Sequence, residues 1–272
     1  MPFFTFHNKQ IFYEDDGSGE PILFLNGIMM STVSWKTFVP ALSKGNRFLR
    51  IDLLDMGQSA RMDEHYTQDI QVEVVKAFLD HLQIAKINIM GISYGGEVAI
   101  KFALKYQNLL RRLMLFNTTS RTNEWLRDIG RGWNKVGATL DGEAYYNMTI
   151  PIIYSSNFYV ANYGWMEHRR KLLIPLFSTP EFQERMKRLV TSAESLDEAA
   201  NIHRIEVPTL IVSSEFDQLT PSSEQAYLAE HIKNSTHIIV PKAGHAFMYE
   251  KPHIFVSLVL GFTNSSTDKY FI

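Results

Sequence analysis

The chain has 272 residues, of which 45% are hydrophobic, enough for one large core; this composition excludes a disordered or collagen-like protein. Its 27 basic and 29 acidic residues leave a net charge of -2, without the charge blocks that would favour binding to nucleic acid or to an anionic membrane. The chain has no cysteine, which excludes disulfides, a thiolate nucleophile and cysteine-ligated metal. With no signal-peptide pattern and no apolar run long enough for a membrane span, we expect a cytoplasmic protein with a small-molecule partner.

Short β-rich runs alternate with helical patterns along most of the chain. We expect strands at residues 3–7, 10–14, 21–25, 48–52, 87–90, 113–116, 209–213 and 237–240, the first two as a hairpin. Helical spacing of apolar residues predicts helices at residues 33–42, 68–81, 95–106, 222–231 and 252–262. This alternation predicts an α/β fold with a mostly parallel central sheet and helices on both faces. Residues 264–272 are expected to form a short terminal extension.

Residues 121–204 interrupt the alternation. They are helical in pattern and contain three of the four tryptophans, Trp125, Trp133 and Trp165. We expect this segment to be a helical lid inserted into a core that is formed by residues 1–120 and 205–272.

The strongest motif is Gly91-Ile92-Ser93-Tyr94-Gly95-Gly96, which follows a predicted strand and precedes a predicted helix. A serine on such a sharp strand-to-helix turn has its hydroxyl exposed, and glycines two residues before and after it avoid steric collision. The helix N-terminus also brings backbone N–H groups to the turn. Ser93 is therefore the candidate nucleophile, against the alternative of a glycine-serine turn without chemistry.

A serine hydroxyl needs a general base and an acid that orients the base. Of the nine histidines, only His245 lies in a turn directly after a late strand, where sites collect in open α/β sheets. The preceding strand is followed by Asp217, our candidate for the acid, with Glu215 as the local competitor. The chain order serine, acid, histidine is the order that this type of fold uses.

Stabilising a tetrahedral oxyanion takes two backbone N–H donors. One is expected from Tyr94, the residue after the nucleophile, and the other from Ile28, in the loop that follows the third strand. Gly27 would allow the tight turn there.

Together these residues resemble the α/β-hydrolase superfamily, in its lid-containing esterase and lactonase-like branch. The resemblance covers nearly all of the core: residues 26–27 and 52–59, the Ser93 turn and the loops of Asp217 and His245. It implies a serine hydrolase. Asn26 departs from the histidine that is most common before the glycine, and residues 54–56 depart from a common Arg-Gly-His run; we expect the first change to alter loop hydrogen bonding more than chemistry.

Residues 26–35 and 52–59 also resemble the hydroxyacyl acyltransferases of rhamnolipid and polyhydroxyalkanoate precursor synthesis. This partial resemblance makes acyl transfer from a thioester, with coenzyme A or an acyl carrier protein as partner, the leading alternative. The basic runs at residues 168–171 and 185–188 could meet such phosphates, although solvated helix faces explain them more simply.

We therefore expect an enzyme that cleaves a carboxylic ester, lactone or thioester of a small apolar acyl substrate through an acyl-enzyme. Neither a cofactor nor a metal is expected. A non-catalytic ligand-binding member of the fold is a further alternative. The expected pocket residues are Met29, Trp125, Trp133, Tyr159, Trp165 and Phe247.

Overall fold

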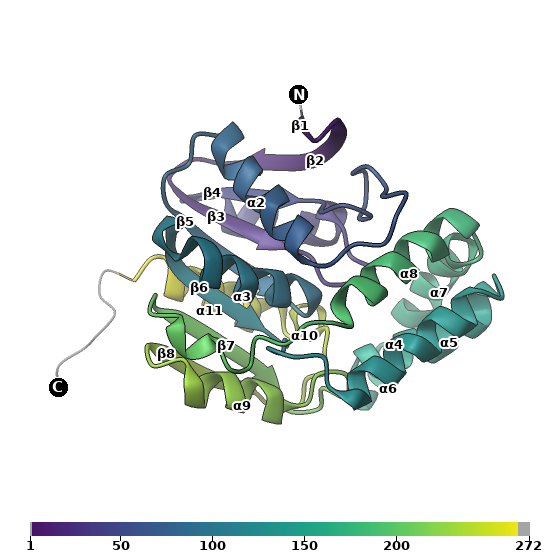
Figure 1. Ribbon diagram of the computed structural model, residues 1–272. Coiled ribbons are helices and arrows are strands. Elements are labelled where there is room, and N and C mark those ends of the chain that lie inside the picture. The colour runs from purple at the N-terminus through teal and green to yellow at the C-terminus, as the bar shows by residue number, and fades with distance from the viewer. Residues whose placement is uncertain (1, 266–272) are drawn as a thin grey trace.

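An eight-stranded sheet with strand order β1-β2-β4-β3-β5-β6-β7-β8 forms the centre of the computed structural model, which describes residues 2–265 (Figure 1). The strands are β1 (Phe3–Phe6), β2 (Lys9–Asp16), β3 (Glu20–Leu25), β4 (Asn46–Ile51), β5 (Ile87–Ile92), β6 (Leu110–Phe116), β7 (Thr209–Ser214) and β8 (Ser235–Val240). The β1–β2 and β2–β4 pairs are antiparallel and all others are parallel. The predicted mostly parallel α/β sheet is thus confirmed; most of the expected terminal extension, residues 266–272, lies outside the described residues.

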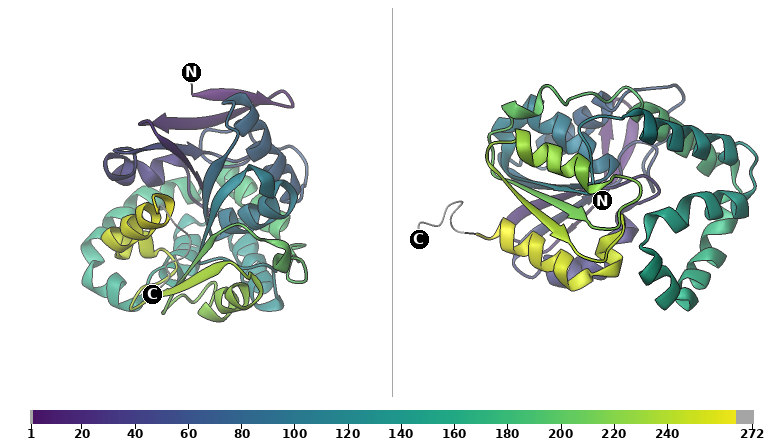
Figure 2. Two further views of the ribbon diagram at one scale, coloured as in Figure 1. Left: turned by 90° about the vertical axis from the view of Figure 1, so that its left-hand side faces the viewer. Right: turned by 90° about the horizontal axis from the view of Figure 1, so that it is seen from below.

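Helices cover both faces of this sheet (Figure 2). Helices α2 (Asp69–His81), α3 (Tyr94–Tyr106) and α9 (Ser222–His231) pack on one face, and η1 (Thr32–Phe38), α1 (Val39–Leu42), α10 (Phe247–Glu250) and α11 (Pro252–Thr263) pack on the other. The short turns η2 (Gln107–Leu109) and η3 (Ile202–Arg204) complete the core. Alternate residues of each strand face opposite sides: Leu23 and Leu25 belong to one apolar cluster, and Ile22 and Phe24 to the other.

Five helices lie between β6 and β7 and project beside the sheet, at the right of Figure 1. They are α4 (Glu124–Gly137), α5 (Gly142–Ile153), α6 (Ser156–Ala161), α7 (Tyr163–Phe177) and α8 (Pro180–Ala193), and we call them the helical insertion. Asn123, Asp141, Ser155 and Thr179 cap four of them through side-chain oxygens that accept backbone N–H groups. No helix within residues 2–265 has the length and apolarity that crossing a membrane demands.

The sheet order places several loops at one edge. From β3 the chain moves to β4 on one side, whereas β5 pairs with β3 on the other side. Such a reversal leaves a crevice at the carboxyl ends of the neighbouring strands. The loops that follow β3, β5, β6, β7 and β8 all leave this edge, because these five strands are parallel neighbours.

Candidate active site

Ser93 occupies a strained turn between β5 and α3. Its φ of 52° and ψ of -124° lie outside the conformations that residues with a side chain usually adopt. The flanking glycines allow this turn: a Cβ on Gly91 would lie 2.3 Å from the Gly95 carbonyl oxygen, and a Cβ on Gly95 would lie 2.2 Å from the Leu25 carbonyl oxygen. Backbone crowding, more than flexibility, therefore explains the two glycines of the motif.

Asp217 and His245 meet although 28 residues separate them. His245 Nδ1 lies 2.7 Å from Asp217 Oδ2, and both residues are more than nine-tenths buried. A carboxylate only accepts hydrogen bonds, so the Nδ1 position carries the proton and Nε2 is left as the acceptor of the neutral ring. This arrangement provides a base whose free nitrogen can take a proton.

Other side chains fix the Asp217–His245 pair. Asp217 Oδ1 accepts the backbone N–H groups of Leu219 at 2.8 Å and Thr220 at 2.9 Å. The Thr220 hydroxyl lies 2.9 Å from Asp217 Oδ2 and 3.2 Å from His245 Nδ1. Asn117, at the end of β6, donates from Nδ2 to the His245 carbonyl oxygen at 2.7 Å. Loops after three consecutive strands thus hold the imidazole in one orientation.

Glu215 takes no part in this network. It is exposed, and its Oε2 accepts the backbone N–H of Lys242 at 2.8 Å. This contact joins the loop after β7 to the turn after β8. The geometry therefore favours Asp217 over Glu215 as the partner of His245.

The loop after β3 lies against Ser93. A Cβ on Gly27 would be 3.4 Å from the Ser93 Cβ, and the loop closes through a hydrogen bond from Met30 N–H to the Gly27 carbonyl at 3.2 Å. Tyr94 is the first residue of α3, where the backbone N–H has no partner inside the helix. Ile28 and Tyr94 therefore both lie next to the serine and line the same cavity.

Asn26 stands where the superfamily most often has histidine, and its side chain makes hydrogen bonds that shape the loop. Its buried side chain donates to the Ile51 carbonyl at 2.9 Å and accepts from Trp35 Nε1 at 2.6 Å. Asp52 beside it accepts the backbone N–H groups of Thr32 at 2.7 Å and Gln58 at 2.9 Å. These bonds tie the loops after β3 and β4 together, so Asn26 acts on the shape of the loop.

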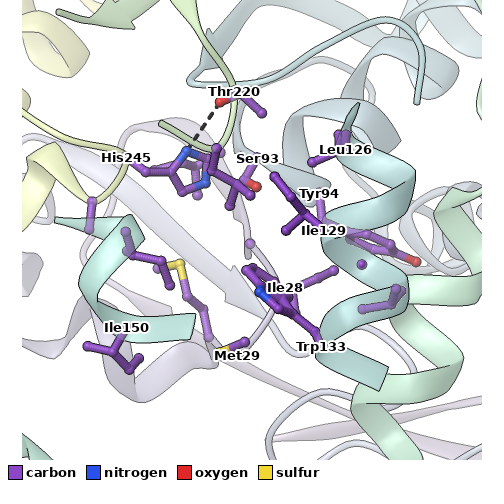
Figure 3. Close-up of a pocket in the computed structure, with 18 of the residues that line it drawn as sticks. Ile28, Met29, Ser93, Tyr94, Leu126, Ile129, Trp133, Ile150, Thr220 and His245 are labelled. Atoms are coloured by element: carbon purple, nitrogen blue, oxygen red, sulfur yellow. Dashed lines mark hydrogen bonds between the residues drawn. The ribbon is translucent and has the colours of Figure 1, made fainter. Parts of the chain in front are cut away.

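These loops and the helical insertion line a cavity of about 130 Å³. Figure 3 shows Ser93 and His245 on one wall, and Leu126, Ile129 and Trp133 of α4 opposite. Apolar side chains predominate among its other lining residues, which include Met30, Ile92, Ile150, Ile153, Tyr154, Leu173, Phe177, Val190, Leu219, Met248 and Tyr249. The helical insertion therefore closes an apolar space over the loop edge of the sheet.

The expected pocket residues divide into two groups. Met29 and Trp133 line the cavity, with Ile28 and Tyr94 beside them. Four do not line it: Trp125 is 61% exposed on the outer side of α4, Tyr159 packs against Tyr163, and Trp165 and Phe247 pack against other rings. For Phe247, which is fully buried, the reason is that its ring fills the core between Phe116 and Phe255.

Leu126 and Ile129 also line the cavity but are not among the residues expected from the sequence. Their helical spacing with the predicted Trp133 could have identified the inner face of α4. Glu97 and Arg169 also line the cavity, and no local pattern marks them. Burial raises the pKa of Glu97 to about 7, against the lowering effect of a hydrogen bond from Gln68 Nε2 at 2.5 Å.

Three arginines of the two basic runs form ion pairs within the protein. Arg170 lies 3.4 Å from Glu143, Arg185 lies 3.0 Å from Glu181, and Arg188 lies 2.7 Å from Asp55. Within residues 2–265, no three histidine, aspartate or glutamate side chains form a cluster suited to a metal ion.

The sheet order and the strained turn after β5 define an α/β protein of the hydrolase type. The chain belongs to the alpha/beta hydrolase family, whose model matches residues 20–252, and it is a hydrolase. MGS-M2, an alpha/beta hydrolase enzyme from a deep-sea metagenome library of the Medee basin, has a crystal structure that matches with a TM-score of 0.98 and 50% identity over 99% of this chain and 100% of that chain.

More distant relatives differ in the substrates that their names give. A 2-hydroxy-6-oxo-6-(2'-aminophenyl)hexa-2,4-dienoic acid hydrolase of Metapseudomonas resinovorans is 24% identical over 94% of this chain and 88% of its own. The enol-lactonase of Burkholderia xenovorans LB400 shares the fold, with a TM-score of 0.84 and 21% identity over 97% of this chain and 100% of its own.

Proposed function

We propose that the protein is a serine hydrolase that cleaves a carboxylic ester, lactone or thioester of a small apolar acyl substrate through an acyl-enzyme on Ser93. The observation that carries the proposal is the arrangement around one apolar cavity. Ser93 on its strained turn, the hydrogen-bonded Asp217–His245 pair and the Gly27–Ile28 loop all border this cavity.

In this mechanism His245 Nε2 takes the proton from the Ser93 hydroxyl as its oxygen attacks the substrate carbonyl. The Ile28 and Tyr94 amides stabilise the oxyanion, and Asp217 stabilises the imidazolium. The protonated imidazole then donates its proton to the leaving group. Water, deprotonated by the same nitrogen, attacks the acyl-enzyme and releases the acid.

The size and lining of the cavity support a small apolar substrate. A volume of about 130 Å³ is close to that of an apolar cavity that holds benzene, about 150 Å³. The helical insertion, which we propose to be a lid domain of residues 121–204 on a core of residues 1–120 and 205–272, supplies much of the wall. The names of relatives, which include a dienoic acid hydrolase and an enol-lactonase, support hydrolysis but give different substrates.

The test compares initial rates on acyl esters and acyl-coenzyme A thioesters of increasing length for the wild type, Ser93→Ala and Ser178→Ala. Ser178 is exposed on the helical insertion and serves as the matched control. We expect free acid from the wild type and Ser178→Ala, none from Ser93→Ala, and an acyl mass on Ser93 by mass spectrometry. Activity that persists in Ser93→Ala would overturn the mechanism. Transfer of the acyl group to an alcohol or thiol would establish an acyltransferase, and binding without turnover a ligand-binding protein.

A further inference from the structure

Arg169 of α7 lines the same cavity as Ser93 and His245. Its Nε is buried and has no hydrogen-bond partner. Within residues 2–265, none of its three nitrogens makes a hydrogen bond or ion pair. A partly buried guanidinium cation therefore borders an apolar space. Leaving the buried Nε–H without an acceptor costs free energy, which a ligand in the cavity could offset.

Two aromatic rings hold Arg169 in place. Its guanidinium carbon lies 4.9 Å from the centre of the Trp165 ring and 5.5 Å from that of Tyr249. The Tyr249 hydroxyl donates to the Ser34 carbonyl at 3.2 Å, which fixes that ring. Contacts with aromatic faces stabilise the cation but leave its N–H donors free, because those donors lie in the guanidinium plane.

Arg170, the next residue, has a different environment. It also lies over an aromatic ring, 5.0 Å from the centre of Tyr146, but it pairs with Glu143 at 3.4 Å and donates to the Asn147 side chain. Arg170 does not line the cavity. The chain thus supplies carboxylate and amide partners for one arginine of this pair and none for the other.

The acidic groups around the cavity do not neutralise Arg169. Glu97 pairs with Gln68, and Glu194 lines the cavity without an ion pair to Arg169 among the described contacts. The Glu250 carboxylate accepts hydrogen bonds from the Ser155 backbone N–H, the Ser155 hydroxyl and the Gly244 N–H, so it is already engaged within the protein. Among the described residues no side chain supplies an acceptor to Arg169, so its donors are available to a ligand in the cavity.

We propose that Arg169 binds a carboxylate of the substrate, so that the enzyme prefers esters or lactones that carry a second, free carboxylate. The inference rests on the proposed ester hydrolysis. A carboxylate can accept two parallel N–H groups of a guanidinium. Because the cavity is small, at about 130 Å³, the carboxylate and the scissile carbonyl must be only a few atoms apart, as in a monoester of a short dicarboxylic acid.

The first experiment measures kcat and KM for monomethyl esters of dicarboxylic acids of increasing length and for the matching dimethyl esters. In Arg169→Met we expect kcat/KM for the best monoester to fall about 10-fold to 100-fold, mainly through KM, because a charge-assisted contact is lost. Turnover of the dimethyl ester should stay within about 3-fold, and Arg169→Lys should restore part of the monoester preference. Arg170→Met, the matched control, should retain the wild-type preference.

The second experiment measures binding without turnover, by calorimetric titration of Ser93→Ala with the same monoester. We expect binding that weakens about 10-fold or more when Arg169→Met is added, and that is unchanged when Arg170→Met is added. If the wild type cleaves both esters with equal kcat/KM through Ser93, the carboxylate site is overturned while the hydrolase proposal stands. If neither ester is cleaved but Arg169-dependent binding is measured, the hydrolase proposal fails and the site stands.

Discussion

The Asn117 side chain donates a hydrogen bond of 2.7 Å to the carbonyl oxygen of His245, which joins the loop after β6 to the loop after β8. Asn117 has a φ of 45°, a conformation that asparagine and glycine tolerate best. Replacing Asn117 with glycine therefore removes the amide without adding backbone strain.

For Asn117→Gly we expect kcat to fall about 10-fold with little change in KM, because a displaced base impairs the chemical step more than binding. The lost hydrogen bond should cost about 1 to 3 kcal/mol of unfolding free energy, since it leaves a buried carbonyl unsatisfied. Steady-state kinetics and urea unfolding measure the two effects. Wild-type values in both would show that the Asn117 bond does not position His245.

The Asp217 carboxylate gives a sharper test of the acid. Asp217→Asn keeps the shape of the side chain but lets it donate to the imidazole, which favours the wrong tautomer. We expect kcat/KM to fall by about 10³-fold to 10⁴-fold. Glu215→Gln is the matched control and should leave kcat/KM unchanged, because Glu215 is exposed and holds only a backbone N–H. Equal losses in the two variants would argue against the assignment of Asp217.

Trp133 limits the cavity on the α4 side. Trp133→Leu should enlarge the cavity, so we expect the optimum acyl length to increase by about one to three carbons as activity on the shortest ester falls. Trp125→Leu changes the same residue type on the same helix, but Trp125 is 61% exposed and outside the cavity. Its length profile should match the wild type. A profile that shifts in Trp125→Leu and stays fixed in Trp133→Leu would contradict this description of the wall.

Glu97 should make stability depend on pH. Burial raises its pKa from the usual 4.5 to about 7, so between these values the unfolded chain loses this proton while the folded protein keeps it. The unfolding free energy is therefore unaffected by Glu97 ionisation below pH 4.5. It decreases as the pH rises from 4.5 to about 7, because ionisation then favours the unfolded chain.

In Glu97→Gln this dependence should disappear, and the new amide can donate to Gln68 Oε1, which has no partner. We expect the variant to exceed the wild type in unfolding free energy by up to about 3 kcal/mol at about pH 8, and to differ little at about pH 5. Urea unfolding at both pH values measures this. An equal difference at both would show that the charge of Glu97 is not the cause.

The strands and the paired site residues were accessible from the sequence because local chemistry marks them. Strand β5 is a buried, mostly apolar run that ends at Ile92, directly before Ser93. Asp217 and His245 follow the β-branched runs of β7 and β8, of which β7 is buried throughout. Their meeting follows from strand order, since β7 and β8 are neighbours. The positions of turn residues and apolar runs are therefore enough to predict which loops meet at the carboxyl ends of the strands.

The cavity lining was less accessible because residue type alone does not give the face of a helix. Trp125 and Trp133 belong to the same helix, yet only Trp133 shares the inner face with Leu126 and Ile129. Arg169 and Arg170 are adjacent and chemically identical, and their partners come from elements distant in sequence. Distinguishing such residues requires the tertiary packing.

The two ends of the helical insertion are tied to each other. Thr122 N–H donates to the Leu196 carbonyl at 2.9 Å, and Glu198 N–H donates to the Ser120 carbonyl at 2.8 Å. The chain therefore leaves the sheet and returns at almost the same point, so the insertion can change in length or sequence without moving β6 or β7. In evolution or by engineering, one reaction centre could be combined with different insertions, and substrate preference could diverge while the chemistry stays the same.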